Sequence, residues 1–182
     1  IGLMTGRNNT NQVTASVEAA QAFLSRVYLY MENWQASEQY ASQVLQNSRF
    51  SLVSREKYQM MYIDPAQRTG SRSPEVIWQF NLSEVSNGYI NILFSEPNLF
   101  KVSPSGKLLD LYEDEDIRSG MFASNLSGSQ VYTLKYALHP GIGSTNWPVN
   151  YKVFRLAEIY LNRAEARWHL RNYTGAEQDL RV

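Results

Sequence analysis

With 182 residues, the chain is long enough to bury one well-packed core, so we expect a single domain over residues 1–182. Seventeen basic residues balance seventeen acidic ones, which leaves no net positive charge to attract a nucleic acid or an anionic lipid surface. The lack of cysteine excludes disulfides, thiolate metal ligands and a cysteine nucleophile.

An antiparallel helix pair is predicted for residues 13–48. Apolar residues recur after Thr14 at spacings of three and four, which places them on one helix face. This face consists of Val17, Ala20, Leu24, Val27, Tyr28 and Met31. Asn33 and Trp34 interrupt the pattern, and a second stripe predicts a shorter helix packed back against the first. The second stripe consists of Ser37, Tyr40, Ala41, Val44 and Leu45.

The middle of the chain, residues 49–150, follows no single period and is rich in turn residues. Short strands are expected at Glu75–Phe80 and Val131–Leu138, and a short helix at Glu56–Tyr62. Another helix should begin at Ser103, a typical N-cap residue. This helix would carry Leu108, Leu109 and Tyr112. A long insert on a rigid helical frame is where binding groups are expected.

A second helix pair, expected to be truncated, is predicted for residues 151–182. Its first helix would bear an apolar stripe formed by Val153, Ala157, Tyr160, Leu161, Ala164 and Trp168. Asn172 and Tyr173 mark the turn. Thr174 and Glu177 are spaced as a capping box, which predicts the start of the next helix.

The two helix pairs match each other without gaps at an offset of 139 positions. The matched pairs are Ser25 with Ala164, Trp34 with Tyr173, and Ser37 with Ala176. Small residues at a helix crossing and an aromatic residue at the turn are typical of tetratricopeptide repeats. We therefore predict a mostly α fold: an α–α superhelix of tetratricopeptide-like pairs with a loop-rich insert that contains short strands.

Residues 154–166, Phe-Arg-Leu-Ala-Glu-Ile-Tyr-Leu-Asn-Arg-Ala-Glu-Ala, closely resemble the hallmark helix of the SusD/RagB family of outer-membrane nutrient-binding lipoproteins. Further pieces resemble family elements and appear in the family's order along essentially the whole chain. They are Ala22–Met31, Phe50–Leu52, Glu75–Phe80, Asp116–Arg118 and Leu134–Tyr136.

This resemblance implies a non-enzymatic protein on the cell surface that captures glycans or peptides for uptake. Its implied partner is a SusC-like TonB-dependent outer-membrane transporter, which it covers as a lid. Full-length members carry a lipid-anchoring cysteine and N-terminal helices that are absent from this sequence, so we expect the membrane anchor to lie outside it. The alternative is a tetratricopeptide-type scaffold that binds another protein through its helical groove.

Sugar binding requires flat apolar rings for the C–H faces of pyranoses and amides or charged groups for their hydroxyls. Loop aromatics with neighbouring asparagines are therefore the candidate ligand-binding residues. They are Trp147 with Asn146, Tyr89 with Asn91, Phe94, and Phe100 with Asn98. Three other tryptophans, Trp34, Trp78 and Trp168, fall on predicted helices or strands and are expected to pack against the scaffold.

Other chemistry has weak support in the sequence. Glu158, Glu165 and His169 share a helix face, but we expect ion pairs between helices there, and we predict no metal site or cofactor. The acidic run Glu113–Asp116 lacks the alternation of a calcium loop, so a solvated helix end is favoured, with Asp116 paired to Arg118 or another arginine. The sequence shows no Ser-His-Asp arrangement, and we predict no catalytic residues.

Overall fold

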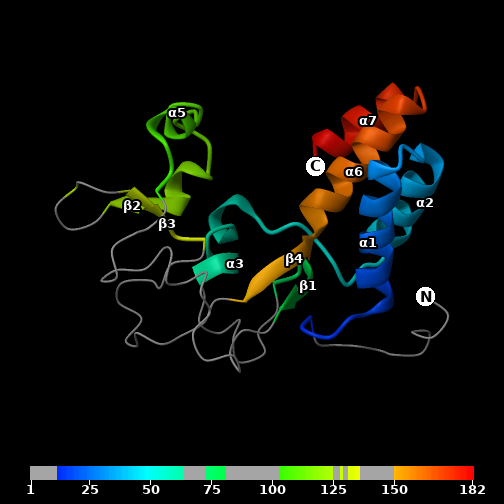
Figure 1. The fold of residues 1–182 in the computed structure, drawn as a ribbon, viewed down its shortest axis with the longest axis horizontal. Helices are drawn as coiled ribbons and strands as arrows, with labels where there is room; N and C mark the ends of the chain where they lie inside the picture. Colours follow the sequence, from blue (N-terminus) through cyan, green and yellow to red (C-terminus); the bar gives the residue numbers. More distant parts are fainter. Residues whose placement is uncertain (1–11, 64–72, 81–102, 125–127, 129–130, 136–149) are drawn as a thin grey trace. The chain divides into compact units, whose positions relative to one another are not determined.

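The computed structural model describes residues 12–63, 73–80, 103–124, 128, 131–135 and 150–182 (Figure 1). These residues fall into two compact units. The first unit contains the described residues among 12–52, 73–80 and 152–182. The second contains those among 53–63 and 103–151. The predicted mostly helical fold with short strands is confirmed.

Four helices form the frame of the first unit. They are α1 (Val17–Tyr30), α2 (Trp34–Leu45), α6 (Leu156–His169) and α7 (Tyr173–Leu180). Each helix packs against the next in this order, so that the second pair continues the stack begun by the first (Figure 1). Stacked helix pairs of this kind bury a continuous core that one pair could not form.

The repeat is confirmed at the level of individual turns. Asn33 and Asn172, 139 positions apart, are the N-caps of α2 and α7, and each side chain accepts a hydrogen bond from the backbone N–H three residues later. Just before the caps, Glu32 and Arg171 adopt positive φ angles of 57° and 62°. A left-handed residue ends one helix and redirects the chain, so the two turns have the same geometry. Asn172 also corrects the predicted capping box at Thr174.

The predicted stripe of the second helix is confirmed, since the buried residues of α2 are Ser37, Ala41 and Val44. The buried faces of α1 and α6 differ from the predicted stripes. On α1 the buried residues are Ala19, Ala22 and Ser25, and on α6 they are Leu156, Ile159, Asn162, Ala164 and Ala166. Met31, Leu161 and Trp168 are instead exposed, at 66%, 56% and 61%. Close approach of two helices requires small side chains, so the packed face is the one with small residues and not the one with the largest apolar residues.

A two-stranded sheet, formed by β1 (Val76–Phe80) and β4 (Tyr151–Arg155), adjoins these helices (Figure 1). The predicted strand at residues 75–80 is confirmed. Val153, however, lies in β4 and not in a helix, which begins only at Leu156. Residues from both sheet and helices share one core. It contains Ala19, Ala22, Ala41, Val44, Phe50, Ile77, Phe154, Leu156 and Ile159.

Ion pairs between elements lie around this core. Arg26 of α1 donates to Glu158 of α6 at 2.6 and 2.8 Å, and its guanidinium lies 4.3 Å from the Phe154 ring centroid. Arg155 donates to the buried Glu75 carboxylate at 2.6 Å. The expected ion pairs between helices are therefore confirmed for Glu158, whereas Arg155 joins β4 to the turn that precedes β1. Pairs of this kind fix the register of neighbouring elements.

The second unit contains short elements. They are η2 (Arg55–Lys57), α3 (Met60–Ile63), α5 (Gly106–Leu109), η4 (Ser119–Met121), β2 (Phe122–Ser124) and β3 (Val131–Thr133). The N-cap of α5 is Ser105 and not Ser103, because the Ser105 side chain accepts from the Leu108 N–H. Since α5 ends at Leu109, Tyr112 follows the helix. β2 and β3 pair antiparallel, with Ala123 opposite Tyr132.

Candidate functional site

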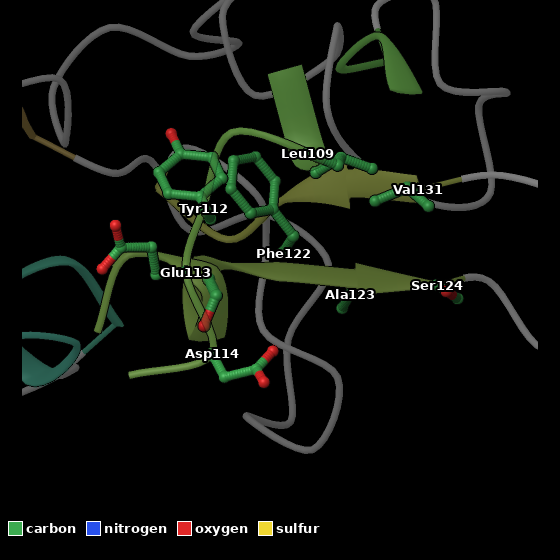
Figure 2. Close-up of a pocket in the computed structure, with 9 residues that line it drawn as sticks. Leu109, Tyr112, Glu113, Asp114, Phe122, Ala123, Ser124 and Val131 are labelled. Carbon is green, nitrogen blue, oxygen red and sulfur yellow. The ribbon is translucent and has the colours of Figure 1, made fainter. Parts of the chain in front are cut away.

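An open cavity of about 380 Å³ lies in the second unit, between the segment that follows α5 and the β2–β3 hairpin (Figure 2). We call it the Tyr112 cavity. Its lining includes Leu109, Tyr112, Glu113, Asp114, Phe122 and Val131. This volume falls in the lower part of the range of about 300 to 1,000 Å³ that is usual for small-molecule sites.

Strand alternation explains why the hairpin presents these side chains. Successive residues of a strand point to opposite faces, so Phe122 and Ser124 share one face. Val131 pairs directly with Ser124 and lies on the same face. On the opposite face Tyr132 is 5% exposed and packs with Ala123 and Leu134. The buried Tyr132 therefore holds the hairpin in place, while Phe122, Ser124 and Val131, together with Ala123, line the cavity.

Two aromatic rings form one wall of the cavity. The ring centroids of Tyr112 and Phe122 are 5.5 Å apart with an interplanar angle of 49°, and Figure 2 shows Leu109 and Val131 on the side of Phe122 away from Tyr112. Both rings are partly exposed. The Arg118 guanidinium lies 5.2 Å from the Tyr112 ring centroid, close enough for a cation–π contact. The rings therefore offer a supported apolar surface to a ligand.

Carboxylates border the rings. Glu113 and Asp114 follow Tyr112 directly, are exposed, and point to the side away from Leu109 and Val131 in Figure 2. Asp116, by contrast, is engaged: hydrogen bonds from the Arg118 side chain, and then from its backbone N–H, lower the pKa of Asp116 to about 2. The predicted pairing of Asp116 with Arg118 is thus confirmed, with a shortest distance of 2.5 Å.

A second open cavity, of about 460 Å³, shares Asp114 and Ser119 with the first. Its lining adds Arg55, Glu56 and Glu115. Gln59 closes one part of this region by donating from Nε2 to the Gly120 carbonyl at 2.9 Å. The two cavities together give the second unit a polar, mostly acidic surface next to a pair of rings.

Rings, carboxylates and hydroxyls in this arrangement match what a saccharide requires. A flat ring face covers the C–H groups of a pyranose, and carboxylates accept strong hydrogen bonds from hydroxyls. Among the described residues, no group of three or more His, Asp or Glu side chains could hold a metal ion. Glu158 is bound by Arg26, and His169 stacks on Trp34 with ring centroids 3.9 Å apart.

The ligand-binding candidates from the sequence fall outside the described residues. They are Tyr89, Asn91, Phe94, Asn98, Phe100, Asn146 and Trp147. Of the tryptophans expected to pack, Trp78 lies against the core, which confirms the prediction. Trp168 is 61% exposed and contacts Tyr173 edge-on, so the expectation that it packs into the scaffold is wrong in that part.

Sequence reasoning missed Tyr112 and Phe122 as site residues. Tyr112 was assigned to a helix face, and the acids after it to a solvated helix end. The available signal was the order Tyr-Glu-Asp, an aromatic residue followed by two acids, between a short helix and a strand. Phe122 lies in β2, and its position beside Tyr112 depends on the pairing of β2 with β3.

Comparison with known proteins places these features in context. The family model described as the SusD family matches residues 122–182, which include β2, β3, β4 and both helices of the second pair. No curated protein matches the sequence. In the described parts of the chain, no helix is long and apolar enough to span a membrane.

Solved structures match over nearly the whole chain. A SusD superfamily protein from Bacteroides thetaiotaomicron is 26% identical with a TM-score of 0.75, over 96% of this chain and 42% of that one. A SusD-like carbohydrate-binding protein from Bacteroides vulgatus is 22% identical with a TM-score of 0.73, over 94% of this chain and 37% of that one. Surface glycan-binding protein A from Bacteroides thetaiotaomicron is 16% identical with a TM-score of 0.75, over 96% and 47%.

This chain therefore spans less than half the length of these structures. The last two likenesses are similarities of fold. The first adds sequence identity, and the family model matches independently over the hairpin, β4 and the second helix pair. Taken together, these findings show that residues 122–182 match the SusD family and that the chain has a SusD-like fold.

Proposed function

We propose that this protein binds oligosaccharides without covalent chemistry, as a surface module for nutrient capture. The observation that carries the proposal is the Tyr112 cavity, where two rings lie beside two exposed carboxylates. The SusD-like fold supports it, since one structure of the same fold is described as carbohydrate-binding and another as a surface glycan-binding protein. A glycan would lay a sugar face on the rings and donate hydroxyl protons to the acids.

The loop aromatics outside the described residues belong to the same proposal. Trp147 with Asn146 and Tyr89 with Asn91 are proposed to extend the binding surface, together with Phe94, Asn98 and Phe100. The local sequence supports this, because each ring has an amide neighbour within a few positions.

Binding to a glycan array, followed by isothermal titration with each oligosaccharide that is retained, tests this function. Tyr112→Ala and Trp147→Ala should each weaken binding at least about tenfold, which corresponds to about 1.4 kcal/mol. Tyr30→Ala is the matched control, since Tyr30 is 83% exposed on α1 in the other unit. Undiminished binding by Tyr112→Ala would remove the Tyr112 cavity from the site, and undiminished binding by Trp147→Ala would remove that residue.

We also propose that the bound glycan passes to a SusC-like TonB-dependent transporter, with the protein held at the outer-membrane surface by a lipid anchor outside this chain. The SusD/RagB-like character of the chain supports this proposal. A gene for a large TonB-dependent barrel beside this gene, and co-purification of the two products, are the expected results. Uptake that is unchanged after deletion of this gene would contradict it.

The second candidate function is a protein-binding scaffold. It is favoured by exposed apolar side chains on α6 and α7: Leu161 at 56%, Trp168 at 61% and Leu180 at 63%. Large apolar side chains exposed together on a repeat surface are a common mark of protein contacts. No retention of any glycan, combined with specific capture of one protein that Trp168→Ala abolishes, would favour this function.

A further inference from the structure

The Tyr112 cavity has an uneven distribution of charge. Glu113 and Asp114 both line it, and none of the described residues in its lining is basic. Neither carboxylate forms an ion pair with any residue that the structure describes. Among the described residues, the charge that a ligand meets beside the rings is therefore negative.

The described cation beside the rings does not offset this charge. Arg118 lies beside Tyr112, but its Nε and Nη2 both donate to the Asp116 carboxylate, at 2.5 to 3.0 Å. The pair is neutral in sum, so Arg118 does not compensate Glu113 and Asp114. The adjoining second cavity repeats this bias, since its lining holds one arginine, Arg55, among several acids that include Asp114.

We propose that this cavity selects saccharides by charge and accepts neutral or amino sugars while it rejects uronic acids and sulfated sugars. This inference rests on the proposed glycan-binding function and specifies the substrate class of the same site. A neutral pyranose donates hydroxyl protons to the two carboxylates, and a protonated amino sugar adds a favourable charge. A uronate or sulfate brings another anion to a cavity whose described lining holds no cation, and the repulsion between like charges weakens its binding.

The geometry also explains why the rings alone would not discriminate between neutral and charged sugars. Tyr112 and Phe122 contact the apolar face of any pyranose in the same way, whatever charge the sugar carries at its edge. The polar groups at the edge of the sugar contact Glu113 and Asp114, which lie beside the rings (Figure 2). Affinity is thus assigned to the aromatic wall and charge selection to the acidic border.

The test compares ligands that share a backbone and differ at C6, where a hydroxyl is replaced by a charged carboxylate, and the salt dependence isolates the effect of the charge. Each neutral oligosaccharide retained on the array is titrated beside the same oligosaccharide with its primary C6 hydroxyls oxidised to carboxylates. At about 20 mM salt the wild-type protein should bind the oxidised form at least about tenfold more weakly, and about 0.5 M salt should narrow the gap because mobile ions screen exposed charges. An amino-substituted form should bind at least as well as the neutral one.

The double variant Glu113→Gln/Asp114→Asn should reduce the discrimination to about threefold or less, since amides keep the size and lose the charge. The control variant Glu165→Gln/Glu177→Gln makes the same change in net charge on the exposed surface of α6 and α7, and should keep the wild-type ratio. Thermal unfolding of the same preparations shows whether the variants differ in Tm, and the titrations are done at a temperature at which all variants are folded.

Three outcomes separate the hypotheses. Wild-type protein that prefers the neutral form, with a preference lost only in the Glu113/Asp114 variant, supports the inference. Glycan binding with equal or stronger affinity for the oxidised form overturns the charge selection and leaves the proposed function standing. Retention of no glycan of any charge class overturns both.

Discussion

Replacing Asp179 by asparagine should destabilise the first unit strongly. This carboxylate is 5% exposed and bridges two arginines of α6. Its Oδ1 accepts from Arg163 Nη2 at 2.6 Å, and its Oδ2 accepts from Arg163 Nε and Arg167 Nη1, both at 2.9 Å. The Asp179 side chain thereby links α7 to α6.

The magnitude follows from the loss of charge at nearly constant size. An asparagine has one acceptor oxygen and an NH2 group that would face a guanidinium donor, so at least one of the three hydrogen bonds is lost and the others lose the charge of the carboxylate. Removing one partner from a buried ion pair usually costs about 3 to 5 kcal/mol. We expect the lower end, about 3 kcal/mol, because Arg167 keeps Glu38 at 2.9 Å and Arg163 keeps Ser42 at 3.4 Å. For a chain of this size this is about 6 to 12 °C in Tm.

Circular dichroism at 222 nm during thermal unfolding measures this effect, with urea unfolding as a second readout. The control is Glu177→Gln on the same helix, which removes an exposed i,i+4 pair with Arg181. It should cost about 0.5 kcal/mol or less. Equal shifts for the two variants would show that the bridge adds no more than a surface pair, and the reasoning would then be refuted.

Three further predictions concern packing, capping and pH. Ala22→Leu should lower the free energy of unfolding by about 1 to 3 kcal/mol in urea titrations, because position 22 is fully buried in the core shared with the neighbouring elements; an unchanged midpoint would contradict this packing. Asn33→Ala and Asn172→Ala should each cost about 1 kcal/mol, and similar losses are expected because the caps are repeat equivalents. The folded pKa of Asp116, about 2, lies below its ordinary value of 3.8, so its pair with Arg118 stabilises the fold above about pH 4 and loses that effect as pH falls towards 2. The difference in stability between wild type and Asp116→Asn should shrink over that window, and a constant difference would argue against the pairing.

In the helical frame, particular residues show which features the sequence predicted correctly and which it did not. The match at an offset of 139 positions placed Ser25 and Ser37 at buried helix crossings, where both are 0% exposed. The Ser37 hydroxyl donates to the Ser25 carbonyl at 3.0 Å, a contact between helices that no periodicity indicates. The apolar stripes failed at Leu161 and Trp168, because periodicity marks hydrophobic residues and does not say which face the next helix covers.

The candidate site was less accessible to sequence reasoning. Tyr112 and Phe122 are ten positions apart in different elements, and their rings meet only because the chain turns after α5 and β2 pairs with β3. The sequence also did not indicate the charge of the cavity. Four consecutive acids look alike in a sequence, whereas in the structure Asp116 is held by Arg118 and Asp114 borders two cavities.

The helix pairs, their repeat, their turns and the family resemblance could be inferred from the order of residues alone, because they depend on residues within a few positions of one another and on a pattern that occurs twice. Which faces are buried, which arginine holds which carboxylate, and where rings and acids meet became known only from the packed fold. Those features depend on contacts between segments distant in the chain, such as Arg26 with Glu158, and no local spacing encodes the distance between their side chains.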